Sequence, residues 1–160
     1  TTHDDPARLA EIDAFAAAIT WSHVAERASR NQGRALLDTA ARAFGHAALV
    51  DARERVMRNE LHGHLAPAFG FLTRTLDVTR DDALAAYLHL TARGMLSSAV
   101  RLGVLGPTEA QSIHHRLHPV LDAACARARD ASLDDVAQTA PLVELFQATQ
   151  DRLYSRLFQS

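Results

Sequence analysis

The sequence contains no lysine, and all 17 of its basic side chains are arginine. Its formal net charge is only −2, and a domain without a basic surface is a poor candidate for binding nucleic acid. A helical DNA-binding regulator is therefore the least favoured of the function classes considered. A GC-rich genome is the simplest reason for the arginine bias, and selection for bidentate contacts with a partner is the alternative.

Cysteine and long apolar runs are also scarce. The single cysteine, Cys125, excludes an internal disulfide and is compatible with a reducing compartment. No apolar run approaches the roughly 20 residues that span a bilayer, and no signal peptide is apparent. We therefore expect a cytoplasmic protein that makes no contact with membranes. The chain opens with Thr-Thr-His rather than Met, so we expect that its natural N-terminus has been removed.

The common catalytic signatures are missing as well. The sequence has no glycine-rich phosphate loop, no G-x-S-x-G elbow, no H-E-x-x-H pair and no C-x-x-C motif. Ser97 and Ser98 are better explained as small packing residues of a helix than as nucleophiles, and Cys125 as a small buried residue. The sequence therefore offers no catalytic constellation, and we predict no catalytic residues and no cofactor.

What is present favours helices. Ala and Leu dominate the apolar residues, and β-branched residues are few. A chain of 160 residues has the size of one domain, and no strand-like alternation of any length occurs. We predict one all-α domain over residues 1–160, a helical bundle of about seven or eight helices. The helical segments are 5–19, 22–44, 47–58, 67–76, 80–102, 108–130 and a last one that begins at Pro141.

Small residues inside two of these segments predict close helix packing. Gly33 lies within segment 22–44, where a glycine costs on the order of 1 kcal/mol relative to alanine. Close approach of another backbone is one explanation for it, and a local bend is the other. Gly94 and Ser98 form a stripe of small residues on segment 80–102, where a neighbouring helix could approach.

The clearest break in the chain lies within residues 96–111. Gly106 and Pro107 end the preceding helix, because proline cannot continue it. Thr108 with Gln111 forms a capping-box pattern that predicts the start of the next helix. Further predicted caps are Ser22, Thr79 with Asp82, and Ser132 with Asp135.

Nine histidines raise the question of a metal site. His62 and His64 form an H-x-H pair in an expected loop. His114 and His118 lie one helical turn apart, a spacing at which two imidazoles can chelate nickel, zinc or copper. A closed site needs three or four ligands, and the sequence shows no such pattern. We predict no metal site, and we keep a small His-rich metal carrier as the alternative function.

The C-terminus and one arginine are predicted to contact partners. The tail combines an aromatic group, a cation and apolar groups, which are types enriched in interface hot spots. Its candidate residues are Tyr154, Arg156, Leu157, Phe158 and Ser160. A tail folded onto its own core is the alternative. Arg101 either bonds across a helix junction or contacts a partner.

Four stretches of the sequence resemble one family. Residues 98–111 resemble the pattern S-A-x-R-L-x-x-L-G-Q-T-x-x-Q of the UreF family of urease accessory proteins, and residues 155–160 resemble its closing S-R-L-F-R-S. Residues 29–37 are similar to its S-x-x-Q-G-x-x-L-L helix, and residues 83–87 to its A-x-x-A-Y helix start. The stretches follow the family's order and span most of the chain, from residue 29 to residue 160.

The chain also departs from the family pattern. It lacks the family's N-terminal segment S-P-x-x-P-x-G-x-[FY]-x-x-S-x-G-[LI]-E. Pro107 stands where the family has Gln, and Gln159 stands where it has the penultimate Arg. Gln150 and Asp151 stand where it has His and Glu.

The resemblance implies an all-α scaffold that is not itself an enzyme and is commonly a homodimer. It implies three partners, namely a UreD/UreH-like accessory protein, the GTPase UreG and apo-urease, to which their assembly delivers nickel. It also implies a part in coupling GTP hydrolysis to nickel release. Because the tail carries an Arg-Leu-Phe sequence, we predict that it docks on the UreD/UreH-like partner and becomes ordered there.

Overall fold

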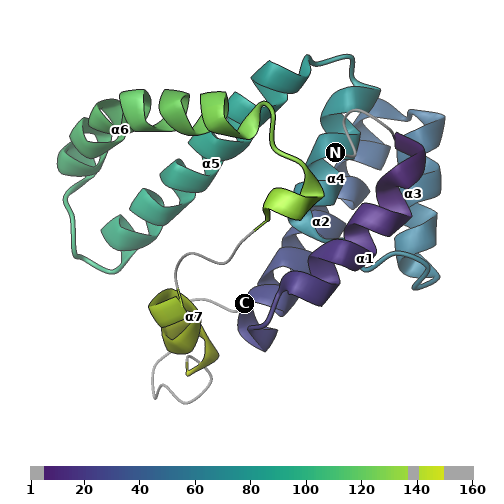
Figure 1. The fold of residues 1–160 in the computed structure, drawn as a ribbon, viewed down its shortest axis with the longest axis horizontal. Coiled ribbons are helices and arrows are strands. Elements are labelled where there is room, and N and C mark those ends of the chain that lie inside the picture. Colours follow the sequence, from purple (N-terminus) through teal and green to yellow (C-terminus); the bar gives the residue numbers. More distant parts are fainter. Residues whose placement is uncertain (1–5, 137–140, 150–160) are drawn as a thin grey trace. The chain divides into compact units, whose positions relative to one another are not determined.

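The computed structural model describes residues 6–136 and 141–149, and every regular element in these ranges is a helix (Figure 1). The α-helices are α1 (Leu9–Ile19), α2 (His23–Phe44), α3 (Ala47–Met57), α4 (Leu65–Thr75), α5 (Arg80–Arg101), α6 (Pro107–Ala128) and α7 (Pro141–Ala148). Two 3₁₀ turns, η1 (Pro6–Arg8) and η2 (Leu133–Asp135), complete the elements.

The all-α prediction is confirmed, but the predicted count of seven or eight helices is slightly high. Six helices, α1 to α6, have eleven or more residues, and α7 has only eight. The short turn after Ser132 is a 3₁₀ turn of three residues rather than a helix. The chain divides into two compact units where we predicted one domain. The first contains residues 1–78 and 136–160, and the second contains residues 79–135. We call them unit 1 and unit 2.

Unit 1 is built around α2, which packs against both α3 and α4, while α1 packs against α4 (Figure 1). Its buried side chains come from all four helices and from the loop before α4. They include Leu9, Leu37, Leu49, Val56, Leu61, Phe71 and Leu72. Burial of leucine- and phenylalanine-sized side chains stabilises a fold by about 1.5–3 kcal/mol each, so this core accounts for the arrangement of α1 to α4.

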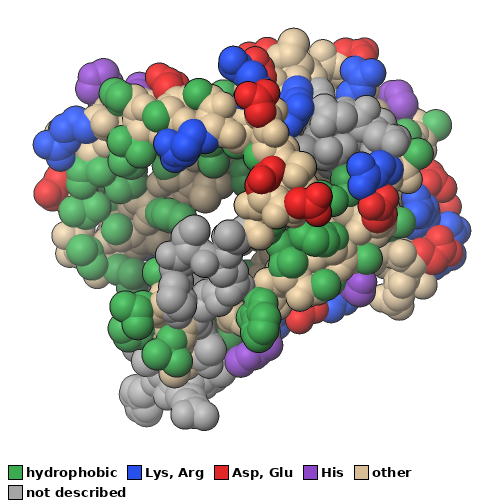
Figure 2. All heavy atoms as spheres, viewed as in Figure 1, with side chains coloured by type: hydrophobic (Ala, Val, Ile, Leu, Met, Phe, Trp, Pro, Cys, Tyr) green, Lys and Arg blue, Asp and Glu red, His purple; other side chains and the backbone are tan. Residues whose placement is uncertain are grey.

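Unit 2 is a hairpin of two long helices, α5 and α6, which lie side by side (Figure 1). Among its residues, Ala83 and Ala110 are the buried hydrophobic ones. Hydrophobic side chains cover much of the visible face of these helices in Figure 2. Its large exposed apolar residues are Leu90, Met95, Leu102, Val104 and Val120. No described helix of either unit is long and apolar enough to cross a membrane.

The helix caps follow the sequence in three places. The Ser22 hydroxyl accepts a hydrogen bond from the Ala25 N–H, and the Thr79 hydroxyl accepts one from the Asp82 N–H. The Ser132 hydroxyl donates to Asp135 at 2.8 Å and holds the 3₁₀ turn. These predicted caps are confirmed.

The predicted capping box of Thr108 and Gln111 is wrong. Helix α6 begins at Pro107 instead, with Gly106 as its N-cap and no side-chain hydrogen bond at that cap. Proline is favoured at the first helical position because its fixed φ suits a helix and its missing N–H has no partner there. The helix therefore starts one residue earlier than predicted, which leaves Thr108 inside its first turn.

Candidate functional site

The most highly connected polar group of unit 1 is the carboxylate of Asp13 on α1, which is only 2% exposed. It accepts hydrogen bonds from three successive backbone N–H groups, those of His62, Gly63 and His64. The N···O distances are 2.6, 3.1 and 2.8 Å. Hydrogen bonds to a charged acceptor are stronger than neutral ones, so Asp13 fixes the loop that precedes α4.

Ser29 on α2 fixes the same loop from the other side. Its hydroxyl oxygen accepts a hydrogen bond from the Leu65 N–H at 3.2 Å and lies 3.2 Å from Nδ1 of His64. The nearby Arg34 donates from Nε to the carbonyl oxygen of His62 at 3.1 Å. Helices α1 and α2 thus hold one loop between them.

Gly33 lets α2 approach this loop. A Cβ at Gly33 would lie 2.3 Å from the carbonyl oxygen of Gly63 and 2.7 Å from the carbonyl carbon of His64. Both atoms belong to backbone that Asp13 and Ser29 hold in place, so a side chain has no room here. The close approach suggested by a glycine within a helix is present. We call Asp13, Ser29, Gly33 and residues 62–65 the loop clamp.

His64 is the titratable side chain at the centre of the loop clamp. It is 1% exposed, and its Nε2 is buried with no hydrogen-bond partner among the described residues. Burial lowers the pKa of His64, while the nearby carboxylate of Asp13 acts against that shift. The neutral imidazole is therefore favoured, and it serves as a packing group between α2 and the loop.

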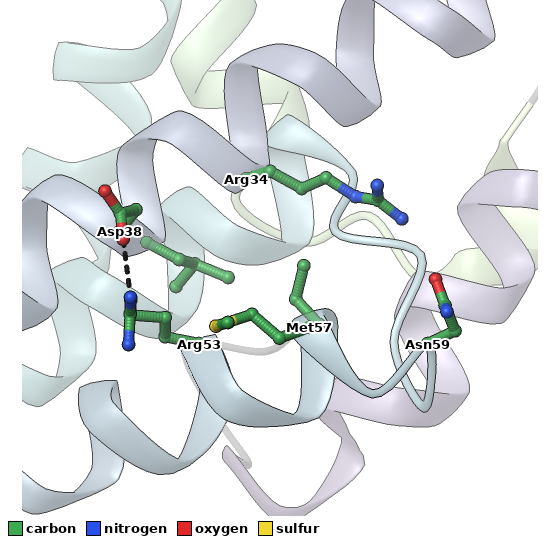
Figure 3. Close-up of a pocket in the computed structure, with 7 residues that line it drawn as sticks. Arg34, Asp38, Arg53, Met57 and Asn59 are labelled. Atoms are coloured by element: carbon green, nitrogen blue, oxygen red, sulfur yellow. Dashed lines mark hydrogen bonds and ion pairs between the residues drawn. The ribbon is translucent and has the colours of Figure 1, made fainter.

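A shallow hollow of about 230 Å³ lies beside the loop clamp, between α2 and α3. Figure 3 shows Asp38 and Arg53 directed toward each other across it, with Arg34 extended along its edge. Nε of Arg53 lies 2.6 Å from the Asp38 carboxylate, and this hydrogen bond lowers the pKa of Asp38. The charges of Asp38 and Arg53 are thus paired with each other, and Arg34 adds a second positive charge to the lining of the hollow.

The predicted metal candidates fall into two separate places. His62 and His64 have ring centroids 6.1 Å apart in unit 1, but His64 is enclosed in the loop clamp. His114 and His118 lie 5.8 Å apart on α6 in unit 2. Throughout the described ranges, no three His, Cys, Asp or Glu side chains are arranged so that they could hold a metal ion.

The remaining candidates lie at the surface or outside the described residues. Arg101 is the last residue of α5 and is exposed. A Cβ added at Gly94 or at Gly106 would have no atom within 4 Å, so neither glycine is in close helix contact in the structure described. The Ser98 hydroxyl donates to the Gly94 carbonyl oxygen of its own helix. Outside the described residues lie the tail candidates Tyr154, Arg156, Leu157, Phe158 and Ser160.

Sequence reasoning missed Asp13, the residue with the most contacts in the loop clamp. The available signal was its position four residues after Leu9 and next to Ile12, on the apolar face of α1. A charged residue within an apolar face requires buried partners. Those partners lie about fifty residues further along the chain, and spacing rules within one helix do not reach them.

The fold and the loop clamp together define a helical protein. The buried polar groups of the loop clamp hold a loop of the protein's own backbone in place. Comparisons with known proteins identify its family. The UreF family matches residues 1–118, and the chain belongs to this family. The resemblance seen in the sequence is thereby confirmed.

Curated relatives come from plants and bacteria. Urease accessory protein F of Oryza sativa subsp. indica is 29% identical, and that of Arabidopsis thaliana 30%, each over 156 residues. Urease accessory protein UreF of Rhodopseudomonas palustris (strain BisA53) is 32% identical over 158 residues. These matches cover 96%, 94% and 98% of this chain, but 60%, 63% and 64% of the relatives. The chain thus spans about 60% of the length of the first relatives. No solved structure matches it.

Proposed function

We propose that this protein acts in urease maturation as a scaffold without catalytic activity of its own. In this role it joins a UreD/UreH-like protein to the GTPase UreG while nickel is delivered to apo-urease. The observation that carries the proposal is the family match over residues 1–118, together with relatives that bear the name urease accessory protein. We further propose that it works as a homodimer in the cytoplasm.

The described surface supports a role in binding other proteins. Soluble monomers rarely expose large contiguous apolar patches, and such patches commonly mark interaction sites. Helix α7 exposes Leu142, Val143, Leu145 and Phe146, each by more than half. This helix immediately precedes the predicted docking tail, so we place the contact with the UreD/UreH-like partner on α7 and the residues after it.

The experiment is a capture assay with the tagged full chain, a UreD/UreH-like protein and a UreG-like GTPase. We expect all three proteins to elute together, and a chain ending at Leu153 to lose the UreD/UreH-like protein. Arg152→Ala serves as the matched control, because it changes an arginine just before the tail. Undiminished capture by the shortened chain would contradict docking through the tail. Failure of the folded full chain to capture either protein would contradict the scaffold role.

Arg101 is tested separately, by two measurements on one variant. If it contacts a partner, Arg101→Ala leaves the melting temperature unchanged and abolishes capture. If it supports the junction after α5, the melting temperature falls. Arg116→Ala is the control, because Arg116 is also an exposed arginine of unit 2.

A further inference from the structure

Unit 2 contains a cluster of four imidazoles at the contact between α5 and α6. His89 comes from α5, and His114, His115 and His118 come from α6. The ring centroids of His89 and His114 are only 4.2 Å apart. The His118 ring centroid lies 5.7 Å from that of His89, 5.8 Å from that of His114 and 5.5 Å from that of His115. We call these four side chains the histidine cluster.

The geometry favours neutral rings. Neutral imidazoles can pack closely, but imidazolium ions within a few ångströms of one another repel, because like charges disfavour ionisation. Nε2 of His114 is also buried and has no hydrogen-bond partner in the part of the chain that is described. In a protonated histidine both ring nitrogens carry a hydrogen, so protonation would leave a cationic N–H there without an acceptor.

Charged groups of both signs line the hollows beside the cluster, and a hydrogen bond with the His89 backbone acts against the lowering of the His114 pKa. Arg93 on α5 lines the hollow that also contains His114, and its positive charge opposes protonation there. Asp122 on α6 lines the second hollow, beside His89 and His118, and it is exposed. The pKa of His114 is lowered by desolvation first, and then by the charges of His89 and His118.

We propose that the histidine cluster makes the packing of α5 against α6 sensitive to protons, so that the helices are held together near neutral pH and loosened on acidification. The two buried hydrophobic residues of the described hairpin are alanines, Ala83 and Ala110, so the cluster adds to a contact made mostly by half-buried side chains. The proposal does not depend on the role in urease maturation, because it concerns a contact within one unit of the chain.

The direction of the pH dependence follows from the linkage between proton binding and folding. The folded hairpin favours an uncharged His114 ring, since the pKa of His114 is lowered there, so the unfolded chain binds more protons at this site at acid pH. Stability from the cluster is therefore complete above the ordinary histidine pKa of about 6.5 and is lost as the pH falls below it.

Amide hydrogen exchange of the full chain tests this, measured at about pH 7.5 and about pH 5.5 and corrected for the intrinsic pH dependence of exchange. A metal chelator is present, so that no added ion can link the rings. We expect protection of the α5 and α6 amides to be clearly lower at about pH 5.5 than at about pH 7.5. Equal protection at both conditions would overturn the proposal.

Two variants identify the side chains responsible. His89→Gln removes an exposed ring from the cluster and leaves His114, with its buried Nε2, in place. It should at least halve the decrease in the logarithm of the amide protection factor between the two pH values. His23→Gln, at the exposed start of α2, is the matched control and should behave as the unaltered chain does. The same acid sensitivity in both variants would assign the effect to other groups and refute the cluster as its source.

Discussion

Unit 1 and unit 2 are both helical, but they bury very different amounts of their side chains. Of the fifteen buried hydrophobic residues in the described ranges, thirteen lie in unit 1, and Ala83 and Ala110 lie in unit 2. Unit 1 also has the loop clamp, in which one carboxylate accepts three backbone hydrogen bonds. The structure of α1 to α4 is therefore determined from within, whereas the hairpin of unit 2 has few fully buried side chains.

The two units also contrast in how they hold histidine. His64 and His114 both have a buried Nε2 without a partner among the described residues, and burial lowers the pKa of both. His64 is enclosed by backbone with the Asp13 carboxylate nearby, whereas the His114 ring lies against the imidazoles of His89 and His118. One histidine thus contributes to a rigid loop, and the other belongs to a contact between two helices.

The largest difference in stability is expected between two glycine-to-alanine variants, one inside α2 and one inside α5. Gly33→Ala forces a Cβ against backbone atoms of the loop clamp that cannot move aside, and we expect a loss of about 4 kcal/mol or more. Gly94→Ala meets open space and should gain up to about 1 kcal/mol, the helix preference of alanine. Chemical denaturation measures both. Similar losses in the two variants would show that the contrast at these glycines is absent.

Removing the carboxylate of the loop clamp should have the next largest effect. Asp13→Ala leaves three backbone N–H groups without their acceptor, two of them buried, so we expect a loss of about 3 kcal/mol. Asp51→Ala on the exposed face of α3 is the control and should stay within about 0.5 kcal/mol. An Asp13→Ala variant as stable as Asp51→Ala would show that the loop is held by other contacts.

Acidification should then affect unit 1 through His64. Its pKa is lowered in the folded chain, so the neutral ring stabilises the fold above the ordinary value of 6.5, and this stability is lost as the pH falls below it. Amide exchange of α4 between about pH 7 and about pH 5 measures the effect. His64→Gln should flatten the acid slope, and the exposed His62→Gln should keep it. A steep slope in both variants would remove His64 from the explanation.

The smallest effect concerns two threonines near the starts of α5 and α6. Thr79→Ala removes the N-cap hydroxyl that accepts a hydrogen bond from the Asp82 N–H, and it should lower the free energy of unfolding by about 1 kcal/mol. Thr108→Ala removes a hydroxyl that caps nothing, and it should cost less than about 0.5 kcal/mol. Protection of the first-turn amides of each helix reports the two losses separately. A larger loss at Thr108 would restore the capping box that the structure contradicts.

Local signals in the sequence predicted much of the helical structure. Thr79 is an N-cap as predicted, and the glycine at position 33 indicated a close backbone contact. The start of α6 was misjudged, because two start signals, Gly106-Pro107 and Thr108-Gln111, compete within a few residues. Proline at the first helical position prevailed, since its φ is already fixed.

Contacts between distant residues could not be predicted in the same way. The spacing of His114 and His118 was visible on one helix, but the approach of His89 depends on how α5 packs against α6. Asp13 likewise has no local partner. The interiors of both units therefore depend on tertiary contacts that periodicity along one helix does not contain.

The loop clamp has a consequence for the order of events during synthesis. Asp13 leaves the ribosome 50 residues before Gly63, and at about 5–20 residues per second roughly 3–10 s pass between them. Helix α1, with eleven residues, is too short to persist alone in water. Helix α1 therefore gains its partners only after the loop before α4 has emerged, and until then its apolar face stays open to chaperones.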